Sequence, residues 1–373
     1  MSMREEYAAM IEEQITNSEV DGAESRPAIH TEPAITEYED LPELPPEIIE
    51  GVIRKGGKLL VAGASKAGKS YLLIELAVAV STGGWWLDRF KCMKGRVLYV
   101  NLEIQRPQFM HRVCRVTDTL HANRTMVNDN LMVANLRSKY SDAAALVDGL
   151  IATCKRGEFD LVIIDPAYKI QPGSENDADA ITRFCAELDR LVEALDCTVA
   201  YSHHHSKGGQ GGKNAQDRAS GSGVFGRDAD ALIDMVELGI NDDAYMAERL
   251  RGRRGAIPFR LEFVLRDFKS PEPLNIWFTH PIHVTDDTGT LASCNARKPG
   301  RAHCPGRDRS EATRAEIEAA LEEFMGNQEE VDRKAFVSYI GKDKRTINKH
   351  IEESKLFELV SSASSAIIRR RRT

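Results

Sequence analysis

The chain has 373 residues, of which 42% are hydrophobic and 29% charged, as is ordinary for a globular protein of one or two domains. Its net charge of −7 excludes a chain that coats nucleic acid through its overall charge. No apolar run approaches the roughly eighteen residues of a membrane span, and the acidic, polar start from Met1 to Val20 excludes a secretory signal. Seven cysteines without paired spacing are typical of reduced thiols. We therefore expect a cytoplasmic protein that does not contact a membrane.

Three parts of the chain differ in their patterns. Residues 1–45 show little apolar periodicity and carry several Pro and Glu, which indicates a flexible acidic arm. From residue 46 to about residue 288, short apolar runs alternate with longer helical patterns. Such alternation predicts an α/β fold with a mostly parallel sheet flanked by helices. The predicted strands are Lys58–Ala62, Val97–Asn101, Leu161–Ile164, Thr198–Ser202 and Ala231–Val236, and the predicted helices are about 69–82, 105–121, 142–156 and 177–195. Residues 260–266 and 274–278 predict an antiparallel pair at the sheet's edge.

The first predicted strand runs into Gly63-Ala-Ser-Lys-Ala-Gly-Lys69-Ser70, the pattern of a phosphate-binding loop. Its glycines let backbone N–H groups curl round phosphates, and the helix that begins near Lys69 presents its positive end to them. Lys69 should reach the β- and γ-phosphates, and the Ser70 hydroxyl should bind Mg²⁺. We therefore predict ATP and Mg²⁺ as cofactors, with the nucleotide held by Gly63, Ala64, Ser65, Lys66, Ala67, Gly68, Lys69, Ser70 and Tyr71. Trp85-Trp86, at the end of this helix, could stack on adenine or on a neighbouring subunit, or pack in the core.

Two carboxylates stand where predicted strands end. Asp165 follows Leu161–Ile164, so it should lie at the sheet's carboxyl edge and orient Mg²⁺ through its water shell. Glu103 follows Val97–Asn101, a position suited to polarising the water that attacks the γ-phosphate. A small-molecule kinase has no need of such a group, because its acceptor is a substrate. The alternative for Glu103 is a solvated charge, but we favour a general base.

Three consecutive histidines follow the fourth predicted strand. Because neighbouring strand residues point to alternate faces, His203, His204 and His205 cannot all bind one metal ion. We expect His203 and His204 to touch the γ-phosphate and report its loss. The loop that follows is glycine-rich, and its Lys207 and Lys213 suit contacts with the backbone of single-stranded DNA. An ordinary surface loop is the alternative.

These motifs together resemble a known family. They are Gly63–Ser70, Tyr99–Glu103, Ile163–Asp165, His203–Gly208 and Arg218–Val224. Over about residues 46–285, their order is similar to that in RecA-like ATPases of the plasmid RepA helicase type, P-loop ATPases of the AAA kind related to replicative hexameric helicases. The resemblance implies a RecA fold, a hexameric ring and ATP sites shared between subunits. It also implies that Glu103 is the catalytic base and that His203 and His204 lie near the γ-phosphate.

In such rings a basic residue of the adjacent subunit completes each site. Arg266 is our candidate for this trans residue, because it stands on a late strand before the turn into residues 274–278. At the position of the plasmid enzyme's own arginine this chain has Asp230. The other candidates are Arg251, Arg253, Arg254, Arg218 and Arg227.

Residues 289–310 hold Gly, Pro, Asp and Arg and predict a linker to a small domain at 311–373. Ala315–Met325 predicts an amphipathic helix. Phe336–Ile351 has helix-turn-helix character, in which Asp343 caps the second helix. Residues 356–360 and 366–370 predict a hairpin, so the module resembles a winged helix-turn-helix. Its second helix would present Lys344, Arg345, Asn348 and Lys349 to a DNA major groove. A small packing or partner-binding domain is the alternative.

The function that these features favour is an ATP-hydrolysing motor on single-stranded DNA, a replicative helicase of a plasmid, phage or mobile element. Its expected partners are single-stranded DNA, copies of itself in a hexameric ring, and a replication initiator or primase. The alternative is a DNA-bound ATPase switch, or a recombination or replication accessory, without processive unwinding. A small-molecule P-loop kinase is a more remote third hypothesis.

Overall fold

The structure, a computed structural model, describes residues 29, 31, 41–171, 177–205, 215, 218, 224–240, 255–296, 314, 317–326, 328–340, 343–361 and 366–371. The chain falls into two units, Met1–Leu44 and Pro45–Thr373. In the first unit, the described residues 29, 31 and 41–44 are all exposed. The rest of the expected acidic arm lies outside the described residues.

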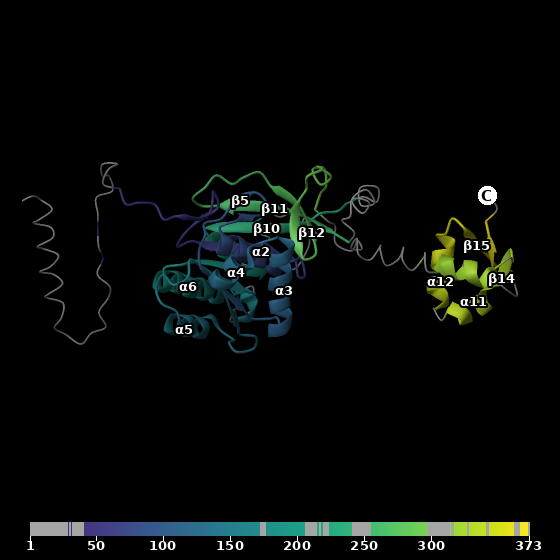
Figure 1. Ribbon diagram of the computed structural model, residues 1–373, viewed down its shortest axis with the longest axis horizontal. Coiled ribbons are helices and arrows are strands. Elements are labelled where there is room, and N and C mark those ends of the chain that lie inside the picture. The colour runs from purple at the N-terminus through teal and green to yellow at the C-terminus, as the bar shows by residue number, and fades with distance from the viewer. Residues whose placement is uncertain are drawn as a thin grey trace, which may run out of the picture. The chain divides into compact units, whose positions relative to one another are not determined.

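The second unit is built on a nine-stranded sheet (Figure 1). Its order is β13 (Ile282–Thr285), β12 (Leu274–Thr279), β11 (Ile257–Leu265), β10 (Ala231–Glu237), β3 (Lys58–Gly63), β9 (Thr198–His204), β8 (Leu161–Asp165), β6 (Val97–Asn101) and β7 (Leu131–Asn135). The strands from β10 to β7 pair in parallel, while β11, β12 and β13 extend the sheet in antiparallel fashion. The five predicted parallel strands and the antiparallel pair at the edge are confirmed. The sequence analysis missed β7 and β13, which are short strands at the two margins.

Helices cover both faces of this sheet. On one face lie α2 (Lys69–Thr82), α3 (Arg106–Thr119) and α4 (Arg124–Asn130), and on the other lie α5 (Ala143–Thr153), α6 (Ala178–Leu195) and α8 (Val224–Asp228). Figure 1 shows α5 and α6 side by side, and they pack together. Alternate residues of β3 serve the two cores: Leu59 and Val61 face α2, whereas Leu60 and Ala62 face the other layer. A strand buried on both faces has to be apolar throughout, which is why β3, β6 and β8 could be predicted.

The helix after the phosphate-binding loop, α2, is buried on nearly every side. It is covered by α3, α4 and β13 on the side away from the sheet. Its apolar sequence therefore has no polar stripe, as expected of a helix inside a core. This burial fixes the start of α2 firmly against the end of β3.

Smaller elements complete this part. Two short hairpins pair β1 (Glu47–Ile49) with β2 (Ile53–Arg54) and β4 (Trp85–Trp86) with β5 (Phe90–Lys91). A 3₁₀ turn, η2 (Ala167–Lys169), follows β8. Beyond β13, Leu291 is fully buried beside Trp277, and Ala296 bridges to Leu238. The packed chain therefore continues into the first residues of the segment expected to be a linker.

The C-terminal residues have a core of their own. The helical residues 317–325 are followed by β14 (Glu330–Asp332), α11 (Arg333–Ile340), α12 (Lys344–Glu352), β15 (Phe357–Ser361) and β16 (Ala366–Arg370). Strand order is β14-β16-β15, and the predicted β15–β16 hairpin is present. The core contains Ile317, Leu321, Phe336, Ile347, Ile351, Phe357 and Ile368. Asp343 caps α12 by accepting the amide protons of Arg345 and Thr346, as predicted. No helix among the described residues is both long and apolar enough to cross a membrane.

Candidate nucleotide-binding site

A cavity of about 470 Å³ opens at the carboxyl edge of the parallel strands, within the usual size range of ligand pockets. Its floor is the loop from Ser65 to Tyr71, between β3 and α2. The ends of three neighbouring strands supply Glu103, Asp165 and His204. These residues are far apart in the sequence, and the parallel order of β3, β9, β8 and β6 brings them together.

The loop needs glycine at two positions for two different reasons. Gly68, directly before α2, has φ of 93°, a left-handed conformation that side chains disfavour. A Cβ at Gly63 would lie 3.1 Å from Cβ of Met235 on β10, so the close approach of β10 leaves no room there. Lys66 also has a positive φ, of 62°. The loop is thus held in a curled conformation that directs backbone N–H groups inward.

Lys69 occupies the centre of the cavity floor. Its buried ammonium group donates hydrogen bonds to the carbonyl oxygens of Gly63 and Ala64, both at 2.8 Å. Its Nζ also lies 3.1 Å from Nδ1 of His204. Burial lowers the pKa of Lys69 to about 8, against the opposing attraction of the Asp165 and Glu103 carboxylates. A cation held in this way can exchange its carbonyl partners for phosphate oxygens.

Asp165 is held rigidly by two hydroxyl groups. Tyr99 on β6 donates to its Oδ2 at 2.8 Å, and Ser202 on β9 donates to its Oδ1 at 2.5 Å. The carboxylate is buried, yet it lines the same cavity as Ser70. Two hard oxygen donors beside a phosphate loop suit Mg²⁺, which keeps most of its waters and takes few protein ligands. Among the described residues, no cluster of three or more His, Cys, Asp or Glu could hold a metal by itself.

Glu103 follows β6 as an exposed side chain at the mouth of the cavity. The hydroxyl of Tyr168, in η2, donates to its Oε1 at 2.9 Å. Burial, together with this bond to Glu103, raises the pKa of Tyr168. The ring of Tyr168 also lies 5.2 Å from that of His204. Sequence reasoning missed Tyr168, although its position directly after Asp165-Pro166 placed it near the same sheet edge.

The three consecutive histidines have three different surroundings. His204 faces Lys69, and burial, with the neighbouring Lys69 charge, lowers its pKa to about 4, so it is neutral at pH 7. His203 lies on the other face of β9, where its Nε2 meets Gln171 at 3.1 Å and its ring packs on Phe225. His205 pairs with the buried carboxylate of Asp234. Since strand residues alternate in direction, the structure brings His204 to the cavity and directs His203 away from it.

Arg266 lies at the opposite edge of the sheet from the loop. Its guanidinium forms an ion pair with Asp230 and donates to the carbonyl oxygens of Arg227 and Asp228. Asp230 in turn accepts the backbone N–H of Lys58, the first residue of β3, whereas the phosphate loop begins at its last residue. Arg266 therefore cannot reach the cavity of its own chain. Of its rivals, Arg251, Arg253 and Arg254 lie outside the described residues, while Arg218 is buried against Asp234 and Glu262.

The residues expected to bind DNA divide into two groups. Lys207 and Lys213 lie outside the described residues. On α12, Lys344, Arg345 and Lys349 are exposed or partly so, and Asn348 lies beside them. The opposite face of α12 buries Ile347 and Ile351 in the C-terminal core.

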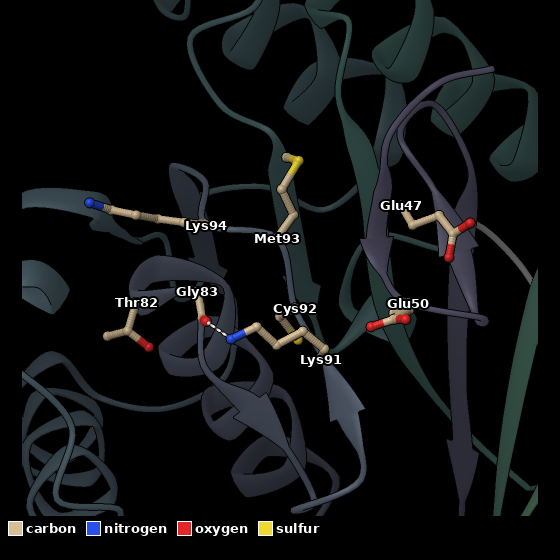
Figure 2. Close-up of a pocket in the computed structure, with 8 residues that line it drawn as sticks. All are labelled: Glu47, Glu50, Thr82, Gly83, Lys91, Cys92, Met93 and Lys94. Carbon is tan, nitrogen blue, oxygen red and sulfur yellow. Dashed lines mark hydrogen bonds between the residues drawn. The ribbon is translucent and has the colours of Figure 1, made fainter. Parts of the chain in front are cut away.

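A second cavity lies at the far end of α2, where Thr82 and Gly83 line it. Figure 2 shows the Lys91 ammonium directed at the Gly83 carbonyl oxygen, which accepts its hydrogen bond at 2.7 Å. Glu47 and Glu50 stand on the opposite side. The carbonyl end of a helix repels anions, so this cavity does not suit a phosphate group.

The loop at the end of β3, the carboxylate that ends β8 and the helices on both faces of a mainly parallel sheet define a RecA-like P-loop NTPase. A model of the AAA domain family matches residues 25–210, which supports ATPase activity. Among solved structures, the chain is similar to an isolated ATPase domain at 13% identity, with a TM-score of 0.44 over 76% of this chain and 99% of that chain. No curated protein matches the chain in sequence. Such a loop implies nucleotide binding, usually with Mg²⁺.

Proposed function

We propose that the chain is an ATP-hydrolysing motor on single-stranded DNA, a replicative helicase of the plasmid RepA type that serves a plasmid, phage or mobile element. The observation that carries the hydrolytic part is the meeting of Lys69, Glu103 and His204 around one cavity. A phosphate-binding lysine and an exposed carboxylate on opposite sides of the γ-phosphate position suit the attack of water.

Each residue has one task in this proposal. Lys69 leaves the carbonyl oxygens of Gly63 and Ala64 and neutralises the β- and γ-phosphates. Ser70 and Asp165 hold Mg²⁺, which offsets phosphate charge. Glu103, oriented by Tyr168, accepts the proton of the attacking water. His204, neutral and 3.1 Å from the Lys69 ammonium, senses whether that cation is bound to phosphate.

The ring and the DNA contacts are the further parts of the proposal. Arg266 would complete the site of an adjacent subunit in a hexamer, because it lies at the sheet edge away from its own loop and half of its side chain is exposed. Its ion pair with Asp230 places a guanidinium beside the residue at the family's own arginine position. Lys207 and Lys213 would follow the DNA backbone, and a replication initiator or primase would load the ring in the cytoplasm.

The test is ATP turnover with Mg²⁺, measured with and without single-stranded DNA, alongside unwinding of a tailed duplex. We expect turnover to rise when DNA is added in the absence of any small acceptor, and the duplex to open. Failure to unwind under any loading condition would exclude the motor. A requirement for a small acceptor would instead indicate the kinase hypothesis.

The basic face of α12 favours a second candidate, a DNA-bound ATPase switch or a recombination or replication accessory. A helix with Lys344, Arg345 and Lys349 outward and Ile347 inward is suited to a major groove, as in a winged helix-turn-helix. Footprinting on the element's own DNA discriminates the two. A sequence-restricted patch without unwinding supports the switch, and unwinding without any patch supports the motor.

A further inference from the structure

Aromatic side chains gather where α2 begins. We propose that Tyr71 and Phe278 form the platform on which the base of the nucleotide stacks, an inference that rests on the proposed function. Both residues line the cavity that holds the phosphate loop. Neither the loop nor the proposed chemistry of hydrolysis requires an aromatic ring at these positions.

The topology of the sheet separates the two ends of this cavity. Glu103, Asp165 and His204 come from β6, β8 and β9, which lie on one side of β3. Phe278 comes from β12, which lies on the other side of β3. A nucleotide that places its γ-phosphate near Glu103 and its other phosphates on the loop must extend away from the hydrolytic end. Its base then lies toward Phe278.

The rings are arranged to receive a flat, polarisable group. The centroids of Tyr71 and Phe278 are 5.4 Å apart and their planes are inclined by 42°. Both side chains are partly exposed, so part of their surface is open to a ligand. The guanidinium of Arg112 lies 4.9 Å from the Tyr71 ring centroid and also lines the cavity. Aromatic faces and a guanidinium plane are the groups on which nucleobases stack.

Buried contacts hold this platform in place. The ring of His283, on β13, stacks on Phe278 at 4.6 Å. His283 Nδ1 lies 2.7 Å from a carboxylate oxygen of Glu75, on the second turn of α2. The Tyr71 hydroxyl meets Nε2 of His280 at 2.9 Å. The edge hairpin β12–β13 is thus tied to the helix that carries the phosphate loop, so the platform and the loop keep a fixed relation before nucleotide binds.

The Trp85-Trp86 pair, considered from the sequence as an adenine contact, does not take this role. Trp86 is fully buried and its Nε1–H donates to the carbonyl oxygen of Leu72 at 3.1 Å. Trp85 is exposed but does not line the cavity. Core packing therefore accounts for Trp86.

The experiment compares two ligands that differ in the base. Calorimetric titration with ATP and with inorganic tripolyphosphate, both with Mg²⁺, is carried out on the full chain and on Phe278→Leu and Tyr71→Leu. We expect each variant to bind ATP about tenfold more weakly, because a stacked ring is lost. Tripolyphosphate affinity should stay within about twofold of the parent's. Phe278→Tyr and Tyr71→Phe keep a ring and should keep ATP affinity within about threefold.

Two controls separate the failure of this inference from that of the proposed function. Phe268, partly buried next to Arg54 and outside the cavity, provides the matched variant Phe268→Leu, which should bind ATP normally. Lys69→Ala should weaken both ligands. If the two leucine variants bind ATP like the parent, or lose both ligands equally, the platform is wrong. If Lys69→Ala binds ATP normally, the nucleotide site itself is wrong.

Discussion

Nζ of Lys69 lies 3.1 Å from Nδ1 of His204, so the cation of the phosphate loop is already in contact with the end of β9. The imidazole accepts this hydrogen bond only while it is neutral, and its lowered pKa of about 4 keeps it so. Protonation of His204 would therefore break the contact and place two cations side by side.

The first prediction concerns stability against pH. The pKa of His204 falls from 6.5 in the unfolded chain to about 4 in the folded one, so the unfolded state binds more protons between these values. The free energy of unfolding should therefore decrease as pH falls from about 7 to 4. Partial exposure limits the loss to roughly 1–2 kcal/mol. Urea unfolding across this range, compared with His204→Gln, measures it, and an equal slope in both proteins would contradict the assignment.

The second concerns the base. Glu103→Gln removes the proton acceptor but keeps the shape of the side chain, so ATP should bind with unchanged affinity. Hydrolysis should slow by about 10²- to 10⁴-fold. Single-turnover hydrolysis and calorimetric binding together measure both effects. Normal hydrolysis by this variant would show that Glu103 is not the base.

The third concerns the residue that orients Glu103. Tyr168→Phe removes the donor of the 2.9 Å hydrogen bond and leaves the ring beside His204. Turnover should fall about five- to tenfold, as for the loss of about 1 kcal/mol of positioning, while ATP affinity stays the same. In the double variant with Glu103→Gln, the tyrosine change should have no additional effect. Full additivity would mean that Tyr168 acts independently of Glu103.

The fourth concerns the shared site. Lys69→Ala leaves a subunit with Arg266 but no working loop, and Arg266→Ala leaves the reverse. Mixing the two inactive proteins should restore part of the turnover, since some interfaces then combine an intact loop with an intact arginine. A mixture of Lys69→Ala with Glu103→Gln is the matched control and should be less active. Without restoration in the first mixture, Arg266 is not the trans residue.

The fifth concerns α12. Lys344→Ala and Lys349→Ala each remove one charge from its outer face, so each should weaken duplex DNA binding and lower the salt dependence by about one unit of slope. Lys155→Ala, an exposed lysine before β8, is the control for net charge. Binding titrations between about 50 and 200 mM salt, a range in which such slopes are well resolved, measure the difference. Equal effects of all three changes would place the DNA contact elsewhere.

The sequence by itself was sufficient for the architecture around β3. Lys58–Gly63 and Val97–Asn101 are apolar throughout because both of their faces are buried, and Gly68 marks the start of α2. The position of Asp165 at a strand end followed from the same pattern. Asp343 could be assigned as a cap because a capping bond joins residues that are neighbours in the chain.

Only the tertiary structure decided which side chains meet. Strand alternation separates His203 from His204, but the packing of α2 against one face of the sheet determines that His204 faces Lys69. The contacts of Tyr168 with Glu103 and of Phe278 with Tyr71 join segments far apart in the chain. Local propensity carries no information about such pairs, because strand order and helix packing set them. The sequence therefore determined a phosphate loop on an α/β sheet, and the fold decided what surrounds the nucleotide.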